Sequence, residues 1–509
     1  SSTKAKPLFC VDMNLKTFAQ EGRRRLMVGV SRRLDYWGFD GKGQVTEAPI
    51  AVSGGFTHRG QIHDDPRALE LWSALKEAMH KRGREVVIEE AAYTWFNRVM
   101  AMRILSRGGY DEPQLDVEAG ASSLQPLMLR RARQGHAPFL SAEDRNRLNK
   151  VVSDYSKEQE ALALLLTGYC RQHGTLSEVF GRPDDFTELL LPDDMLKSGG
   201  FLHLLQEAEK DADALTAEQY GKVELIGWLY QYYISEKKDE VFDTFKKGKK
   251  AEAKDIPAAT QIFTPNWIVK YMVENTAGKA WLDKHPTSPL KGQMTYLVEN
   301  EADGTRQPII DRVEDLTLID PACGSGHILV EGFDLIYQMY QEEFASPTEA
   351  VKSILEHNLF GMDIDDRAAQ LSTFAVLLKA AQYDRDIWAR GYRPHVYAMP
   401  YKRTFDGTEV KTYLGEAGKA YANELEIALS RMWDDKNLGA VMKLKLSDQA
   451  HAFITTRQKE LESAQLDFFE KATIQDMTPF IRVLLTMTRR YTSVVANPPY
   501  MGSRNMNAG

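Results

Sequence analysis

Residues 316–340 read LTLIDPACGSGHILVEGFDLIYQMY, and this stretch decides the fold of the second half of the sequence. The apolar run that ends at Asp320 predicts a buried strand. After a glycine-rich turn, Leu329, Phe333, Ile336 and Tyr340 recur at the spacing of one helical face. The stretch therefore predicts a strand, a tight turn and a helix, which is one βα unit.

A second βα unit follows directly. Residues 358–365, NLFGMDID, predict a strand that ends near Asp363, and residues 366–381 predict a helix with Leu371, Ala375 and Leu378 on one face. Successive βα units imply an α/β fold with a parallel sheet, whose ligand site lies at the carboxyl ends of the strands. Further strands are predicted in PHVYAMP (394–400) and TSVVA (492–496), with a charged, largely helical insertion at about 401–490 between them.

The first half of the sequence has a different pattern. Residues 1–250 predict a mostly helical N-terminal domain, and 251–509 form the second domain. Two helices stand out for their aromatic content, in EEAAYTWFNRVMAMRILSRGG (89–109) and in VELIGWLYQYYI (223–234). Because aromatic helical faces usually pack against neighbouring helices, we expect both to lie in a core.

Composition limits the class of protein. No run approaches the roughly 20 apolar residues that cross a bilayer, and three scattered cysteines give neither a disulfide framework nor a zinc site, so a cytoplasmic protein is expected. The net charge of -8 does not favour nucleic-acid binding, so any DNA contact must be local or be supplied by further sequence. Three basic clusters are expected to be solvated surface, and the last is also a candidate phosphate-contacting linker: Arg23–Arg25 with Arg32 and Arg33, Arg130–Arg133, and 246–254.

The glycine turn carries the first candidate site, which comprises Asp320, Pro321, Ala322, Cys323, Gly324, Ser325 and Gly326. The turn lacks the lysine of a phosphate-binding P-loop and the G-x-G-x-x-G of a dinucleotide site. Asp320 suits the ammonium group of an amino-acid-like cofactor, and the glycines allow close passage of the rest of that ligand. Asp363 lies where a doubly wound fold presents a carboxylate to ribose hydroxyls, whereas Asp365 is expected to be an N-cap.

The second candidate site is Asn497-Pro498-Pro499-Tyr500, at the end of the last predicted strand. An amino group on an aromatic ring is a poor nucleophile because its lone pair is delocalised. The amide oxygen of Asn497 and the carbonyl of Pro498 can each accept one of its N–H groups, and the two prolines hold that carbonyl in place. Tyr500 offers a ring on which a flipped base can stack. These four residues are therefore predicted to be catalytic.

In this order, the glycine turn, the acidic strand end and the NPPY segment resemble the gamma-class amino-methyltransferases. The resemblance implies a Rossmann-like class I methyltransferase sheet and S-adenosylmethionine as the cofactor. It also implies an upstream cofactor segment at Phe263-Thr264-Pro265, with Thr264 and Pro265 at the cofactor carboxylate and Ile268, Val269 and Met272 beginning an amphipathic helix. Ile364, next to Asp363, is assigned to the cofactor site in the same way.

A second resemblance covers nearly the whole chain. YTWFNRVMAMRIL (93–105), GWLYQYYISEKKDEVF (227–242), TPNWIVKYMVENT (264–276) and NPPYMGS (497–503) resemble the PglX family of BREX phage-defence systems. This resemblance implies methylation of adenine at N6 in double-stranded DNA by base flipping, with other BREX proteins as partners and no metal or membrane. The class has further strands and a target-recognition domain after NPPY. We therefore expect this sequence to be the N-terminal part of a longer protein, with an incomplete sheet and weak DNA binding alone.

Three other functions fit parts of the pattern. NPPY also serves enzymes that methylate protein or RNA amino groups, although the large helical half argues against these compact enzymes. A non-catalytic module that binds the cofactor or a partner is the second alternative. A combined restriction and modification enzyme would need a nuclease metal site, for which the best residues are Asp184, Asp185, Glu236 and Lys238. Solvated charge is the expected interpretation of those four.

Overall fold

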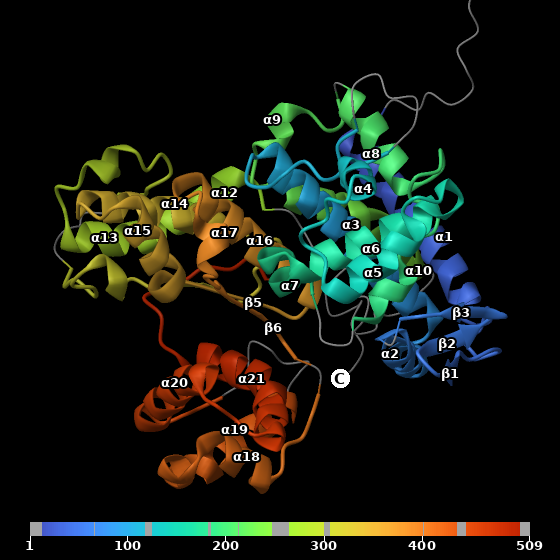
Figure 1. Cartoon of the computed structure of the whole chain (residues 1–509). Helices are drawn as coiled ribbons and strands as arrows, with labels where there is room; N and C mark the ends of the chain where they lie inside the picture. The colour runs from blue at the N-terminus through green and yellow to red at the C-terminus, as the bar shows by residue number, and fades with distance from the viewer. Residues whose placement is uncertain are drawn as a thin grey trace, which may run out of the picture. The chain divides into compact units, whose positions relative to one another are not determined.

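The computed structural model describes residues 13–65, 67–117, 125–181, 185–211, 213–246, 264–299, 306–400, 402–434 and 444–498. The chain divides into two compact units, one of Ser1–Glu240 with Trp388–Gly391 and one of Val241–Ile387 with Tyr392–Gly509 (Figure 1). Within the described residues, none of the helices combines the length and the apolar composition needed to cross a membrane.

The first unit is built mainly from helices, as the sequence predicts. Its longer helices are α1 (Leu15–Tyr36), α2 (Arg67–Arg82), α3 (Arg84–Arg107), α5 (Ala142–Val151), α6 (Glu158–Gln172), α8 (Phe201–Lys210) and α10 (Leu225–Lys246). Its short helices are α4 (Leu127–Arg133), η1 (Tyr155–Lys157), α7 (Gly174–Phe180), η2 (Phe186–Leu190) and α9 (Ala217–Tyr220). Several begin at a side-chain cap, for example Asn14, whose Oδ1 accepts the backbone N–H of Thr17 at the start of α1.

The two aromatic helices predicted to be core do form the core of this unit. Phe96 on α3 packs with its ring centroid 5.4 Å from that of Phe201 on α8 and 5.0 Å from that of Tyr233 on α10. Phe18 on α1 joins them, and all four side chains are almost completely buried. Burial of such large rings, rather than chemistry, accounts for this part of the sequence.

A small antiparallel sheet interrupts the helical pattern and was not predicted. Strands β1 (Ile50–Val52), β2 (Gly55–His58) and β3 (Gln61–His63) pair in the order β1-β2-β3. The strands contain only three or four residues, which is too short for a period-2 pattern to stand out. Arg59 and Gly60 adopt positive φ angles of 48° and 74° and make the tight turn between β2 and β3.

The prediction of solvated surface is wrong for part of the first basic cluster. The Arg23 residue is 7% exposed, and its guanidinium pairs with Glu89 on α3, with 2.8 Å between Nη2 and Oε1. Arg24, by contrast, is exposed and pairs with Glu21 on its own helix. Consecutive residues of a helix point in directions about 100° apart, so Arg23 can be buried while Arg24 is solvated. Of the run 246–254, only Lys246 lies within the described residues.

The second unit contains the predicted parallel sheet. Its strands are β4 (Leu318–Asp320), β5 (Leu359–Asp363), β6 (His395–Ala398) and β7 (Ser493–Val494), in the order β6-β5-β4-β7. All three pairings are parallel. The chain moves from β4 outward to β6 and then returns to the other side of β4, so the strand order reverses at β4. Ligands of such sheets bind at the carboxyl edge beside this reversal.

Polar side chains fix the register at the start of the strands. Asn358 is fully buried, and its Nδ2 donates to the carbonyls of Val313 and Leu316, just before β4, at 2.8 and 2.6 Å. On the other side, Thr317 and Thr492 exchange hydrogen bonds between hydroxyl and backbone at 2.8 to 3.0 Å. Because a slip of β7 would break this threonine pair, β7 enters the sheet in one register.

Helices cover the sheet as the periodicity predicts. The predicted helix after the glycine turn is α14 (His327–Glu342), and the next is α16 (Asp366–Tyr383), with the predicted facing residues of both buried. Asp365 caps α16 by accepting the Arg367 N–H at 3.0 Å, which confirms its expected role. The remaining elements before β7 outside the insertion are α12 (Asn266–Val273), η3 (Glu274–Gly278), α13 (Lys279–Lys284), η4 (Pro289–Gly292), η5 (Val313–Asp315), α15 (Pro347–Ser353), η6 (Ile354–Asn358) and α17 (Ile387–Arg390).

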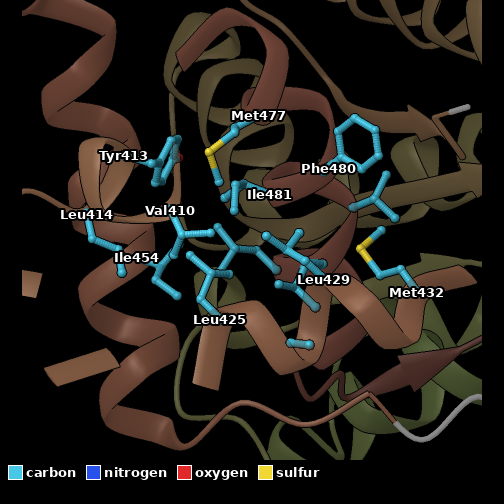
Figure 2. Close-up of a cluster of buried hydrophobic side chains, with 14 of the residues drawn as sticks. Val410, Tyr413, Leu414, Leu425, Leu429, Met432, Ile454, Met477, Phe480 and Ile481 are labelled. Atoms are coloured by element: carbon cyan, nitrogen blue, oxygen red, sulfur yellow. The ribbon is translucent and has the colours of Figure 1, made fainter. Parts of the chain in front are cut away.

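The predicted insertion is helical and has a core of its own. It contains α18 (Gly407–Leu414), η7 (Glu416–Tyr421), α19 (Ala422–Asp434), α20 (Asp448–Ser463) and α21 (Phe468–Thr488). Figure 1 shows the four α-helices gathered into one bundle, and Figure 2 shows Val410, Leu425, Ile454 and Ile481 pointing toward one another inside it. Met362 of β5 belongs to the same cluster, so this core continues to the sheet.

Replacing a fully buried residue of this core tests whether the insertion folds as described. Leu425→Ala on α19 removes a side chain with 0% exposure, and we expect the opening free energy of amides in α19 and α21 to fall by about 2 to 5 kcal/mol. Ile427→Ala on the same helix is the matched control, because Ile427 is 43% exposed and loses little packing. Hydrogen exchange measures both variants. Equal effects of the two substitutions would contradict the described core.

Candidate functional site

The glycine turn after β4 is held against the neighbouring strand by backbone hydrogen bonds. The N–H of Cys323 donates to the carbonyl of Met362 on β5 at 2.8 Å. The N–H of Gly324 donates to Oδ2 of Asp363 at 2.9 Å, and the N–H of Ala322 donates to Oδ1 of Asp320 at 3.1 Å. The two acidic strand ends are thus joined through the turn, and each carboxylate orders part of it.

Asp363 has a second structural bond on the other side. Its Oδ1 accepts the N–H of Asp365 at 2.8 Å, so one carboxylate links the turn to the start of α16. Each carboxylate oxygen has two lone pairs, and these bonds therefore leave acceptor capacity for ligand hydroxyls. Ile364, between the two aspartates, is 50% exposed and presents an apolar side chain beside this carboxylate.

Burial makes both carboxyl groups harder to ionise. Desolvation raises the pKa of Asp320 to about 8, against the bond from Ala322, and the nearby charge of Asp363 adds to the effect. Desolvation also raises the pKa of Asp363 to about 6, although the bonds from Asp365 and Gly324 oppose it. A positively charged ligand group at this place would favour the ionised carboxylates. The Asp320 residue is 1% exposed, so a ligand contacts it only where the covering residues give way.

A side chain would have different consequences at the two glycines of the turn. Gly326 has a φ angle of 90°, and a Cβ there would lie 2.7 Å from Oγ of Ser372 and 3.0 Å from its Cα, so α14 and α16 approach too closely for a side chain. Gly324 has a φ angle of 52°, but a Cβ there would meet no atom of the described residues within 4 Å. Among the residues that the structure describes, the backbone of Gly324 therefore leaves room for a ligand to approach it closely.

The first residue of NPPY contacts the upstream segment. Asn497 follows β7, whose neighbour Val495 donates its N–H to the carbonyl of Ile319 at 2.9 Å, and this pairing brings Asn497 to the carboxyl edge of β4. There the Nδ2 of Asn497 donates to Oγ1 of Thr264 at 2.8 Å. Oδ1, the acceptor atom of the amide, takes no part in this bond. Residues 233 positions apart in the chain therefore meet at one point.

The remaining sequence-predicted residues differ in exposure, and three of them are not described by the structure. Pro321 and Pro498 are exposed, Ala322 and Ser325 are partly exposed, and Pro265 precedes α12 as its N-cap. Cys323 is buried, and desolvation raises the pKa of its thiol well above the usual value. Phe263, Pro499 and Tyr500 lie outside the described residues. The assignment of ligand and catalytic roles to all of these residues stays a prediction.

Some contacts of the site gave no signal in the sequence. The closeness of Ser372 to Gly326 depends on how two helices cross, and the Thr264 to Asn497 bond depends on the pairing of β7 with β4. A hydrogen bond between Oγ of Ser325 and Nδ1 of His327, at 3.1 Å, also orders the start of α14. Only the last pair, two residues apart, has a spacing from which a contact can be inferred.

Of the residues considered for a nuclease site, only Asp185 has a described side chain. Asp185 is buried and bonds Nη2 of Arg98 and the hydroxyl of Thr187, so solvated charge is the wrong interpretation for it. Asp184 and the side chains of Glu236 and Lys238 lie outside the description. Elsewhere in the part of the chain that the structure describes, no group of three His, Cys, Asp or Glu side chains is placed to hold a metal ion.

Family models match the part of the chain that forms the sheet. Residues 298–404 match the model described as MmeI, DNA-methyltransferase domain. Residues 357–509 match the model described as Eco57I restriction-modification methylase. The first match includes the glycine turn and β4 to β6, and the second includes β5, β6, the helical insertion, β7 and the NPPY segment.

Two curated relatives match almost the whole chain. The adenine-specific methyltransferase BrxX of Escherichia coli O9:H4 (strain HS) and the adenine-specific methyltransferase PglX of Lacticaseibacillus casei (strain Zhang) are each 33% identical over 527 residues. The alignment covers 97% of this chain and 43% of each relative, so the chain spans less than half of their length. Over nearly all of its residues, the chain is therefore a homologue of the BrxX and PglX adenine-specific methyltransferases.

Proposed function

We propose that the carboxyl edge of the sheet binds S-adenosylmethionine. The supporting observations are two acceptor carboxylates joined through one turn and the room that the described residues leave beside the backbone of Gly324. Asp320 would accept from the ammonium group and Asp363 from the ribose hydroxyls, with the exposed side chain of Ile364 against the adenine ring. Thr264 and Pro265 would lie at the methionine carboxylate, with Phe263 preceding them. When bound, S-adenosylmethionine supplies a methyl group on a positively charged sulfur.

We propose further that the methyl group goes to the N6 amino group of adenine in double-stranded DNA. The observation that carries this proposal is the position of Asn497, just after β7 at the carboxyl edge of the sheet and bonded to Thr264. Both relatives are named adenine-specific methyltransferases, and both family models describe methylases of restriction or DNA modification. The amino group of adenine has the same chemical requirement for two acceptors that the sequence predicts.

The residues of NPPY would act on the substrate nitrogen. Thr264 holds the amide of Asn497 by its nitrogen, so Oδ1 can accept one N–H of the adenine amino group, while the carbonyl of Pro498 accepts the other. Hydrogen bonds to both N–H groups would favour a more tetrahedral nitrogen that is aimed at the methyl group. As the N–C bond forms, the S–C bond breaks and leaves S-adenosylhomocysteine, and the methylated nitrogen releases one proton to water. Pro499 would fix the backbone, and Tyr500 would stack on the flipped adenine, worth roughly 1 to 3 kcal/mol. The chain would act in the cytoplasm, within a BREX system and with other BREX proteins.

Removing the acceptor of Asn497 tests the proposed chemistry. Asn497→Ala should lower the rate of methyl transfer to DNA by about 100-fold or more, because an acceptor positioned for the reacting group is lost. Affinity for S-adenosylhomocysteine should stay within about twofold, since Asn497 is not a proposed cofactor ligand. Radiolabelled methyl transfer to DNA, RNA and protein in parallel gives the rates. Transfer to RNA or protein alone, or an unchanged rate in the variant, would overturn the proposal.

The bond from Asn497 to Thr264 leads to a second prediction. Thr264→Val keeps the shape of the side chain but removes the acceptor, and one lost hydrogen bond of about 1 kcal/mol corresponds to a roughly fivefold lower kcat. Thr264→Ser keeps the hydroxyl and should stay near the wild-type kcat. Single-turnover kinetics at saturating cofactor separate this effect from cofactor binding. Equal kcat values for the Val and Ser variants would show that the hydroxyl does not position Asn497.

The raised pKa of Asp320 predicts a dependence of stability on pH. Its carboxyl group ionises near pH 3.8 in an unfolded chain but near pH 8 in the folded one, so its contribution to stability is present at low pH and is lost between about pH 4 and 8. The Tm of the wild type should therefore fall relative to that of Asp320→Asn as the pH rises through this range. S-adenosylhomocysteine should reduce the difference, because its ammonium group favours the ionised carboxylate. Parallel Tm curves, with and without ligand, would contradict this prediction.

A further inference from the structure

Three aromatic side chains lie exposed in the segment that follows Thr264. The exposed fractions are 55% for Trp267, 45% for Tyr271 and 37% for Tyr296, and we call these three residues the aromatic patch. Trp267 and Tyr271 are four residues apart on α12 and so share one helical face. The ring centroids of Trp267 and Tyr296 are 6.5 Å apart. Single exposed apolar residues are ordinary, but three neighbouring aromatic rings indicate a binding surface.

The aromatic patch is held in place by buried and partly buried polar groups. The Nδ2 of Asn275 donates to the carbonyls of both Tyr271 and Tyr296 at 2.8 Å. Glu274 is 7% exposed, and its Oε2 accepts the N–H of Tyr296 at 2.6 Å. These bonds fasten residues 296–298 to the end of α12, so the three rings are presented on a fixed backbone. A rigid surface loses less entropy when it binds a partner.

The aromatic patch begins beside the candidate site. Thr264, which accepts from Asn497, is three residues before Trp267 and lies just ahead of the start of α12. Lys270, a partly exposed cation, lies between the two aromatic residues of α12 in the sequence. The rings and this cation therefore belong to the segment that directly follows the partner of Asn497. Such a combination of stacking and local positive charge is how proteins bind single strands of nucleic acid.

We propose that the aromatic patch binds the DNA strand next to the target adenine, with Trp267 stacked on an unpaired base. This inference rests on the proposed function. It identifies a local DNA-binding surface in a chain whose net charge of -8 does not favour DNA binding. Stacking gives affinity without a basic face, because every base has a π face that can stack on an aromatic side chain. The occupant is a nucleotide of the substrate strand, which base flipping unstacks from its neighbour.

DNA binding by matched variants tests the proposal. The probe is a fluorescent duplex with one unpaired adenine, which lowers the energy needed for flipping. Trp267→Ala and Tyr271→Ala should each weaken its binding about tenfold and raise KM for DNA with kcat unchanged. Trp267→Phe should restore most of the affinity. Phe344→Ala is the control, because Phe344 is 95% exposed on another helix end and should leave binding within twofold of wild type.

The outcomes separate this inference from the proposed function. Equal DNA affinities for Trp267→Ala and Phe344→Ala would overturn the inference. A lower Tm or weaker S-adenosylhomocysteine binding in the Trp267→Ala and Tyr271→Ala variants, with DNA affinity unchanged, would also overturn it and make the aromatic patch a packing surface. If wild-type protein bound DNA through Trp267 but transferred no methyl group to it, the inference would stand and the proposed function would fail.

Discussion

The parallel pairing of β4 with β5 on one side and β7 on the other is the constraint on which the rest of the site depends. It brings the ends of three strands to one edge, so Asp320, Asp363 and Asn497 lie at the same edge of the sheet although they are distant in the chain. The pairing is fixed by polar contacts below the edge, through Asn358 and through the hydroxyl exchange of Thr317 with Thr492. Because register errors in a strand reverse every side chain, these few bonds determine whether the acceptors face the same space.

Much of the second unit could be predicted from local patterns. Apolar runs predicted β4, β5 and β6, facing residues predicted α14 and α16, and Asp365 was identified as a cap from its place before a helix. The adjacency of β7 and β4 was not predicted, since no local pattern states which strands pair across more than 170 residues. The bond from Asn497 to Thr264 and the close approach of Ser372 to Gly326 depend on tertiary packing. The strands β1 to β3 were missed because they are too short for a period of two residues to stand out. The burial of Arg23 was missed because it belongs to a basic cluster, and such clusters are usually solvated.

The site combines groups that are costly to bury with few cations to balance them. Asp320 and Asp363 lie where ionised carboxylates are disfavoured. The hydrogen bonds that they accept order the turn but do not neutralise the charge of the carboxylates. A cationic ligand would relieve that cost, which is a physical reason for affinity toward an ammonium group. The DNA-binding surface that we infer also contains few charged groups. Aromatic rings on a fixed backbone, with one lysine in the same segment, would let a chain of net charge -8 bind DNA without a broad basic face.

A crystal structure of the protein bound to S-adenosylhomocysteine would show whether the three strand ends form one binding site. We expect the ligand's ammonium and ribose hydroxyls at the carboxylates of Asp320 and Asp363, its chain across Gly324, and its sulfur facing Oδ1 of Asn497. A ligand bound elsewhere, or an Asn497 that turns its amide oxygen away from the sulfur, would contradict the proposed site.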